Sequence, residues 1–383
     1  MRKYLIISLL ASYSIVFAGE SEDFKAVDNL YKERNFKTAL TESEKFLQKY
    51  PESKHQKSMR DKVAKIYFLE KNYKKAEEIF KRLYTIEEKQ SQKDEYASYL
   101  ARANALLNNS DSAMFYVREI KDKKIFQKTF FAVAQNFLAK ENNEAAQKAY
   151  KEIIDNKYEN YKESMMGLGI VYYNLKDYDK AIYWLSEFSK AVPNENKEMV
   201  SYLRASAIYR KGSTDEAIKY FEKLANMTPA SEYSRKAALY LIEIHSNRKD
   251  EAKVSFYLEK LKGTKEYNTA MTMIGDLYVT KENYNKALDY YGQSNDKNNP
   301  KLIYGEAYSL YKNGKYEEAL KKFQSLKNSD YYNQSIYHIF AINYKLKNFD
   351  EIIRDREIIR KVVVSQVDTD NIIRIIANSA YQV

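Results

Sequence analysis

The strongest constraint on this chain is that its sequence repeats about every 35 residues. The repeated pattern is an aromatic residue, two polar residues and an alanine, followed by apolar residues four and seven positions later. It is clearest at Tyr73-Lys-Lys-Ala76 and Tyr178-Asp-Lys-Ala181. The ten anchor positions, 32 to 37 residues apart, are Ala39, Ala76, Ala113, Ala146, Ala181, Ala217, Ala252, Ala287, Ala319 and Ile352. This regular spacing predicts an array of similar structural units along almost the whole chain of 383 residues.

Each repeat has the pattern of two amphipathic helices. The small anchor residue allows a neighbouring helix to approach closely, and the residues four and seven positions later continue the same helix face. A second small residue precedes most anchors by twelve positions, as Ala64 and Gly169 do. Polar turns such as Glu70-Lys-Asn and Leu175-Lys-Asp separate the two helices, and we expect their Asn, Asp or Gly residues to adopt the left-handed conformation that ends a helix.

The composition agrees with a helical array and excludes a sheet-rich fold. The chain has only 9 Gly and 4 Pro, too few to supply the turns that many short strands require. Pro51, Pro193 and Pro229 follow an anchor by twelve residues, where the second helix must end. Pro300 suits the first turn of the next helix.

These residues together resemble the tetratricopeptide repeat family, whose unit is a helix–turn–helix of 34 residues. The best single match is Gly169, Tyr172, Tyr178, Ala181 and Pro193. The resemblance implies an all-α fold, an α–α superhelix of about ten helix–turn–helix repeats over residues 19–360. Segments 94–122 and 233–262 depart most from the pattern, because they lack the aromatic residue before Ala113 and Ala252.

The resemblance also implies a non-enzymatic scaffold that binds a peptide or protein segment on a concave face lined by the first helices. The alternative is that the tyrosines expected there only fill the packing between repeats, since the chain has 37 of them. The residues expected to face inward are Tyr173, Asn174, Tyr202, Tyr209, Arg210, Tyr304, Tyr308, Tyr311 and Lys312.

Catalytic and cofactor chemistry has no support in the sequence. There is no Cys, and His55, His245 and His338 are too far apart to show metal-ligand spacing. No Gly-rich phosphate loop or nucleophile elbow is present. We therefore expect no enzymatic activity, no cofactor and no metal site. The net charge of +11 is spread along the chain, so nucleic acid is not an expected partner.

The first 18 residues have the layout of a secretory signal peptide. Arg2 and Lys3 precede an apolar run that is too short for a typical bilayer span, and Val16-Phe17-Ala18 suits cleavage after Ala18. We expect an exported protein in the periplasm or on the outer surface of a Gram-negative bacterium, with membrane association only indirect.

The C-terminal segment, residues 361–383, reads as a linker and the first helix of a further repeat. Ile372, Ile373, Ile376 and Tyr381 would then form an exposed apolar stripe. Two alternatives to the scaffold follow. The chain is a structural array that associates with itself through this end, or it is the N-terminal arm of a larger envelope or secretion component.

Overall fold

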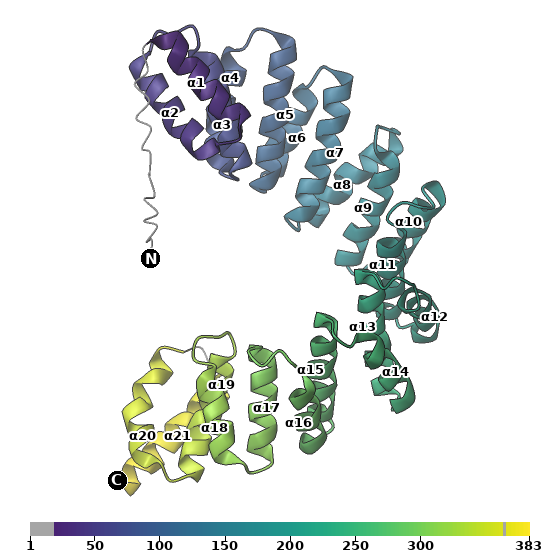
Figure 1. The fold of residues 1–383 in the computed structure, drawn as a ribbon, viewed down its shortest axis with the longest axis vertical. Coiled ribbons are helices and arrows are strands. Elements are labelled where there is room, and N and C mark those ends of the chain that lie inside the picture. Colours follow the sequence, from purple (N-terminus) through teal and green to yellow (C-terminus); the bar gives the residue numbers. More distant parts are fainter. Residues whose placement is uncertain (1–18, 363–364) are drawn as a thin grey trace, which may run out of the picture. The chain divides into compact units, whose positions relative to one another are not determined.

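The computed structural model describes residues 19–362 and 365–383, which form ten consecutive helix pairs and one further helix (Figure 1). The predicted signal peptide, residues 1–18, lies outside the described residues. Every regular element of the described residues is a helix, which confirms the predicted all-α repeat fold.

Each pair consists of a first helix and a second helix joined by a three-residue turn. The first helices are α1 (Glu20–Lys32), α3 (Gln56–Leu69), α5 (Gln90–Leu106), α7 (Lys123–Ala139), α9 (Tyr161–Asn174), α11 (Lys197–Arg210), α13 (Glu232–Asn247), α15 (Lys265–Thr280), α17 (Pro300–Lys312) and α19 (Tyr332–Lys345). The second helices are α2 (Phe36–Lys49), α4 (Tyr73–Ile86), α6 (Ser110–Glu119), α8 (Asn143–Asp155), α10 (Tyr178–Ala191), α12 (Thr214–Ala225), α14 (Glu251–Leu261), α16 (Tyr284–Gln293), α18 (Tyr316–Ser325) and α20 (Phe349–Asp355). A 3-10 turn, η1 (Arg356–Arg360), and the last helix, α21 (Gln366–Gln382), follow.

The contacts divide the chain after Glu195 into an N-terminal unit, with the first five pairs, and a C-terminal unit, with the last five pairs and α21. Within each unit every helix packs against the next helix along the chain. First helices also pack against one another, as α5 does against α7 and α13 against α15. The first helices therefore form a row in each unit, and we call the surface of this row the first-helix face.

The predicted anchors occupy the fourth position of the second helices, where they are buried, with one exception. In α4 the amide of Ala76 donates to the carbonyl oxygen of the N-cap residue Asn72, and Ala76 is fully buried. The prediction was wrong for α14, where Ala252 is exposed and Val254 is buried at the fourth position. The turn ends at Asp250, so the inward-facing position falls two residues after the alanine.

The ten turns share one backbone conformation. The central residue of each turn has a positive φ, between 54° at Glu282 and 99° at Gly212. In the turns before α4 and α10 the left-handed residues are Lys71 and Lys176, and not the neighbouring Asn and Asp as we expected. Those two polar residues instead cap the second helices, because their side chains accept a hydrogen bond from the amide three residues later.

The four prolines lie where the pattern predicts. Pro51, Pro193 and Pro229 lie outside the helices, after the last residues of α2, α10 and α12. Pro300 is the first residue of α17, where its missing amide hydrogen leaves no intrahelical bond unmade.

We call the contact between one helix pair and the next a joint. The side chains that meet in a joint are matched in size. In five joints the eighth residue of a second helix packs on a residue near the middle of the next first helix. In three joints two rings stack: Phe80 on Tyr99 at 4.6 Å, Phe221 on Tyr240 at 4.7 Å, and Phe323 on His338 at 5.0 Å. In two joints a tyrosine faces a glycine: Tyr150 faces Gly167, and Tyr291 faces Gly305. A Cβ at either glycine would lie 2.4 Å from the tyrosine, so glycine is required for this close approach.

The C-terminal helix α21 packs against α19 and α20. The predicted exposed stripe is therefore split between its two faces. Ile372 is fully buried and Ile376 is partly buried against the same core, whereas Ile373 and Tyr381 remain exposed. The prediction that Ile372 is exposed was wrong because positions 372, 376 and 379 share the helix face that contacts the preceding pair.

Candidate interaction surface

The residues predicted to face inward lie on the first helices α9, α11 and α17. Tyr173 and Asn174 belong to the N-terminal unit. Tyr173 packs against Tyr178 at 5.8 Å, and the exposed Asn174 donates to Asn143 across 3.3 Å. The remaining residues lie in the C-terminal unit, where α15 separates two groups: Tyr202, Tyr209 and Arg210 on α11, and Tyr304, Tyr308, Tyr311 and Lys312 on α17.

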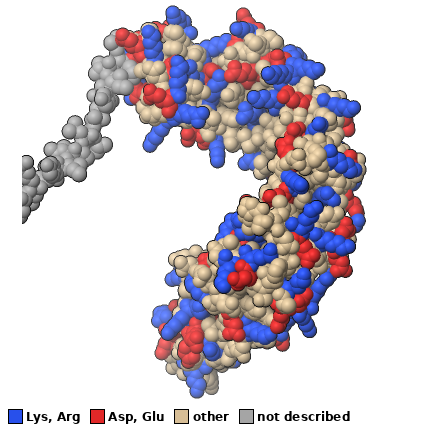
Figure 2. Space-filling view, turned by 45° about the vertical axis from the view of Figure 1, so that its right-hand side comes forward, with Lys and Arg blue, Asp and Glu red and all other residues tan. Residues whose placement is uncertain are grey.

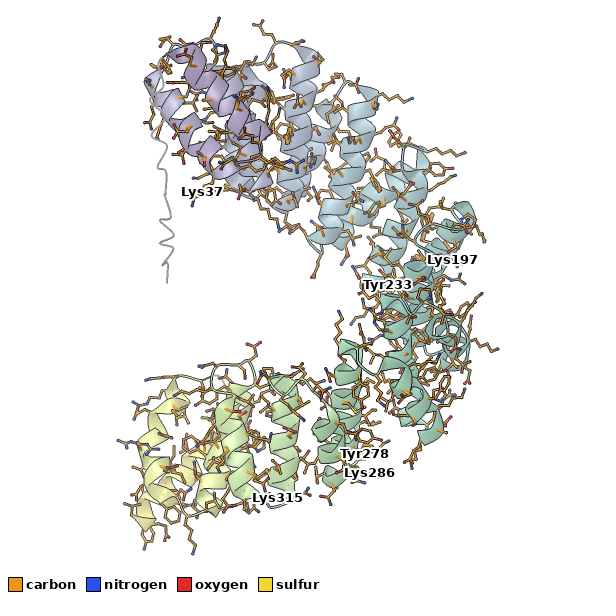
Figure 3. The ribbon with its side chains drawn as sticks, viewed as in Figure 1. Lys37, Lys197, Tyr233, Tyr278, Lys286 and Lys315 are labelled. Atoms are coloured by element: carbon orange, nitrogen blue, oxygen red, sulfur yellow. The ribbon has the colours of Figure 1, made fainter. Side chains whose placement is uncertain are left out.

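The α11 group is completed by two tyrosines of α13. The Tyr240 ring lies 6.0 Å from Tyr202 and 5.5 Å from Tyr209. Tyr233, which Figure 3 labels, lies 5.7 Å from Tyr202. The hydroxyl of Tyr209 donates to Glu243 across 3.2 Å, and burial together with this carboxylate raises the pKa of Tyr209. The sequence reasoning missed Tyr233 and Tyr240. Placing the anchor at Val254 would have revealed Tyr240, because it then takes the same repeat position as Tyr99.

The α17 group surrounds one histidine of the following pair. The centroids of the Tyr304, Tyr308 and Tyr311 rings lie 6.3, 5.5 and 5.3 Å from that of His338 on α19. All three tyrosines are partly buried, and burial raises the pKa of Tyr304 and Tyr311. These tyrosines therefore fill the joint between repeats while each keeps part of its surface on the first-helix face.

Lysines accompany the tyrosines at the turn end of this face. The Lys312 ammonium lies 5.6 Å from the Tyr308 ring centre, and the Lys345 ammonium lies 5.4 Å from that of Tyr316. The only acidic residue within α17 and α19 is Glu306, which is nearly buried and paired with Lys322 of α18. We call the exposed side of α17 and α19 the tyrosine–lysine face. It offers aromatic surface, phenol hydroxyls and positive charge.

The first-helix face of the N-terminal unit has a different chemistry. Its ion pairs link successive first helices: Asp28 of α1 with Lys62 of α3 at 3.0 Å, and Lys65 of α3 with Glu95 of α5 at 2.7 Å. Lys65 also pairs with Asp61 at 2.9 Å. Burial alone would lower the pKa of Lys65, but the hydrogen bonds to the two carboxylates raise it. These charges are therefore largely neutralised by one another.

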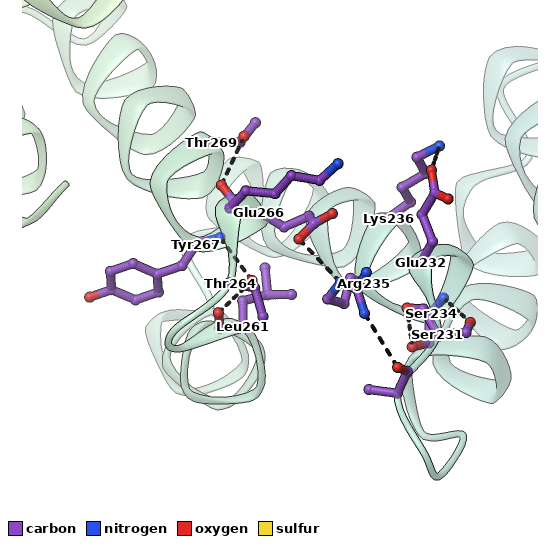
Figure 4. A network of polar contacts seen from close by, with 12 residues as sticks. Ser231, Glu232, Ser234, Arg235, Lys236, Leu261, Thr264, Glu266, Tyr267 and Thr269 are labelled. Carbon is purple, nitrogen blue, oxygen red and sulfur yellow. Dashed lines mark hydrogen bonds and ion pairs between the residues drawn. The ribbon is translucent and has the colours of Figure 1, made fainter. Parts of the chain in front are cut away.

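An ion pair between the partly exposed Arg235 and the buried Glu266 joins α13 to α15 at the opposite end of the first helices. Arg235 Nε donates to Glu266 Oε2 across 3.1 Å, and Arg235 also donates to the carbonyl oxygen of Ala230 (Figure 4). Glu266 is 4% exposed. Because an unpaired buried carboxylate is costly, this pair fixes the spacing of the two helices.

The C-terminal unit also has a cleft between two second helices. It measures about 750 Å³ and lies between α14 and α16, with α15 as its floor. Tyr278 and Tyr290 stack in it with centroids 5.5 Å apart, and the Lys286 ammonium lies 5.2 Å from the Tyr278 ring centre (Figure 3). Its lining carries charges of both signs, with Glu251 and Asp289 beside Lys281 and Lys286. The cleft therefore does not favour a ligand of one particular charge.

The described residues contain no group of three His, Asp or Glu side chains arranged to hold a metal ion. The histidines instead pack against aromatic rings, His55 on Phe24 at 4.1 Å and His245 near Tyr257 at 6.1 Å. Acidic and basic residues are interspersed over the visible surface (Figure 2). Between residues 19 and 383, leaving aside 363–364, no helix has both the length and the apolarity needed to cross a bilayer.

Comparison with known proteins identifies the repeat. A family model described as the tetratricopeptide repeat matches residues 131–196 and 272–333. The chain contains tetratricopeptide repeats. The ten helix–turn–helix pairs with a buried small or apolar residue at the fourth position of each second helix are this family's repeat. Tetratricopeptide repeats generally bind protein partners, and the fold is typically a non-catalytic scaffold.

Several solved structures match this tetratricopeptide repeat protein at low sequence identity. Yeast Tom70 is 13% identical, with a TM-score of 0.39, 95% of this chain covered and 96% of that one. PilW, described as a type IV pilus biogenesis factor, is 15% identical, with a TM-score of 0.39 and coverages of 57% and 97%. A tetratricopeptide repeat protein from Parabacteroides merdae is 9% identical, with a TM-score of 0.42 and coverages of 76% and 98%. No curated protein matches the sequence.

Proposed function

We propose that this tetratricopeptide repeat protein is a non-enzymatic scaffold that holds a segment of a partner protein on the tyrosine–lysine face. The observation that carries the proposal is the composition of α17 and α19, where partly exposed tyrosines and lysines line one surface and the single acidic residue is buried elsewhere. Tyrosine supplies a large contact area and a hydroxyl at low entropic cost, which suits recognition of a protein segment.

A site-specific crosslinking experiment tests the location. A photoreactive amino acid replaces Tyr344, which is 36% exposed on α19 near Lys345, and in a matched control it replaces Phe256, which is 51% exposed on the second helix α14. We expect crosslinked partner protein from the first position and little from the second. Equal capture at both positions would contradict a site on this face.

Charge-reversal variants provide a second test that does not disturb the buried rings. Lys312→Glu and Lys345→Glu change the proposed face, and Lys321→Glu makes the same charge change on the second helix α18, where Lys321 is exposed. We expect the first two variants to capture less partner than the wild-type protein, and the third to capture the same amount.

We also propose that the protein works in the bacterial cell envelope, as the signal-peptide layout of residues 1–18 suggests. N-terminal sequencing of the mature protein and fractionation of the producing cells test this proposal. A mature protein that begins at Gly19 in the periplasmic or surface fraction is the expected result, and an uncleaved cytoplasmic protein would contradict it.

A second candidate function is self-association through α21. The observation in its favour is that Val367, Ile373 and Tyr381 are 69%, 49% and 90% exposed on this helix. Light scattering of the wild-type protein and of the Ile373→Asp variant tests it. Concentration-dependent assembly that this variant loses would favour self-association over the scaffold.

A further inference from the structure

His338 lies at the centre of the packing beneath the tyrosine–lysine face. Its ring stacks on Phe323 of α18 at 5.0 Å with an interplanar angle of 14°, and three tyrosines of α17 approach it from the other helix pair. Tyr337 adds a further ring contact at 5.3 Å. The imidazole therefore connects α17 and α18 of the ninth pair with α19 of the tenth.

The groups around this imidazole suit its neutral form. Nδ1 is buried and has no hydrogen-bond partner, so the doubly protonated ring would place an N–H there without an acceptor. The ionisable groups that face it from α17 are the three tyrosines and Lys312, and α19 contributes Tyr337; Phe323 of α18 carries no charge. The positive charge of Lys312 disfavours protonation of His338. The carboxylate of Asp368 on α21 favours it, and this carboxylate also accepts a hydrogen bond from Ser365.

Burial, as the largest cause, lowers the pKa of His338 to about 4 from its ordinary value of 6.5. When the joint opens, the ring regains its ordinary pKa, so the open joint binds a proton more tightly than the closed one. The closed joint is therefore fully favoured above pH 6.5 and loses stability as the pH falls toward 4. From these two values the opening equilibrium rises about twentyfold between pH 7 and pH 5.

We propose that protonation of His338 favours opening of the joint between the ninth and tenth helix pairs, so that mild acid makes the tyrosine–lysine face open more often and speeds the release of its partner. The part of this inference that concerns the partner rests on the proposed function. The part that concerns the joint does not, because it follows from the ring contacts of the partly buried imidazole and from the burial of its Nδ1 atom.

The chain contains its own control for this inference. Tyr99 and Tyr240 occupy the position of His338 in other repeats and stack in the same way, on Phe80 and Phe221. A His338→Tyr variant therefore keeps a ring that this joint geometry accommodates elsewhere, and it removes the group that titrates. His338→Phe is a second variant in case the added hydroxyl disturbs packing.

Hydrogen exchange of the full-length protein at pH 7 and pH 5, corrected for intrinsic exchange rates, measures the opening. In the wild-type protein we expect opening of α17–α19 to increase about twentyfold at pH 5. We expect the Phe80–Tyr99 joint between α4 and α5 to change little. The His338→Tyr variant should lose the increase. Equal protection of α17–α19 at both pH values, or an increase that persists in both variants, would overturn the proposal.

Partner capture at the two pH values separates the two parts of the inference. Release at pH 5 from the wild-type protein, with retention by His338→Tyr, supports acid control of binding. Capture that is independent of pH, despite a joint that opens, would overturn that control. If opening is observed but α19 captures no partner at either pH, then the proposed function fails and the acid-sensitive joint remains.

Discussion

The Tyr150–Gly167 joint allows a sharp test of size matching between helix pairs. A Cβ added at Gly167 would lie 2.4 Å from Tyr150 Cζ and 2.7 Å from both Cε atoms, so the methyl group would meet the end of the ring directly. Tyr150 is 2% exposed and cannot turn outward without breaking its packing. We therefore expect Gly167→Ala to destabilise the N-terminal unit, although alanine is the better helix former.

The magnitude follows from two opposing effects. Replacing a mid-helix glycine by alanine ordinarily stabilises a helix by about 1 kcal/mol, and overpacking a filled core costs about 1–3 kcal/mol. A contact of 2.4 Å to a ring atom places this site at the costly end, so the net loss is about 1–2 kcal/mol. The matched control is Gly292→Ala in α16, where nothing lies within 4 Å of the added Cβ and a gain of about 0.5–1 kcal/mol is expected.

Urea unfolding measures these changes. The single tryptophan, Trp184 on α10, reports on the N-terminal unit through its fluorescence, and circular dichroism follows the control variant. A double-mutant cycle adds Tyr150→Val, because Val117 and Ala132 occupy the corresponding positions of another joint. The double variant should lose less stability than the sum of the two single variants. An unfolding midpoint for Gly167→Ala at or above that of the wild type, or strict additivity in the cycle, would refute size matching.

Three further predictions follow from the turns, the buried ion pair and the histidines. Lys176→Gly should raise the free energy of unfolding, measured in urea, by about 1 kcal/mol, because glycine adopts the left-handed conformation at φ 61° without a steric penalty; a decrease would contradict this. Arg235→Ala should lower the free energy of unfolding by about 2–3 kcal/mol, since it leaves the buried Glu266 unpaired. The surface variant Arg248→Ala should lower it by less than about 1 kcal/mol, and similar losses in the two variants would argue against a special role for the Arg235–Glu266 pair. An NMR pH titration of the histidine ring signals should show a midpoint near pH 4 for His338, and a midpoint near 6.5 would contradict the lowered pKa.

The helix pairs could be predicted from the sequence because their signals are local. Small residues, aromatic residues and polar turns recur at fixed spacing within each repeat, and burial of the fourth residue of a second helix depends only on where that helix starts. The one anchor that we predicted at the wrong position also shows that burial depends on where the second helix starts. Ala252 matched the residue type of the other anchors, but the turn ending at Asp250 places Val254 in the core.

The composition of the tyrosine clusters could be predicted only in part. Tyr304, Tyr308 and Tyr311 share a helix face by their spacing alone. Their common neighbour, His338, lies in the next repeat and is selected by ring contact across two helices, which no spacing rule within one repeat describes. The burial of Ile372 also depends on contacts between repeats, because it is determined by how α21 packs against the pair before it. The sequence pattern within one repeat therefore did not predict it.

The matched joints also disfavour some of the wrong associations that the helix pairs could make. If a first helix docked against the wrong second helix during folding, the Tyr150 ring would meet the bulky His338 in place of Gly167, or Phe323 would lie over a glycine and leave a void. Both errors are penalised, the first by steric clash and the second by lost contact. The alternation of ring and glycine partners therefore disfavours misregistered assembly, which is the characteristic hazard of a chain built from similar repeats.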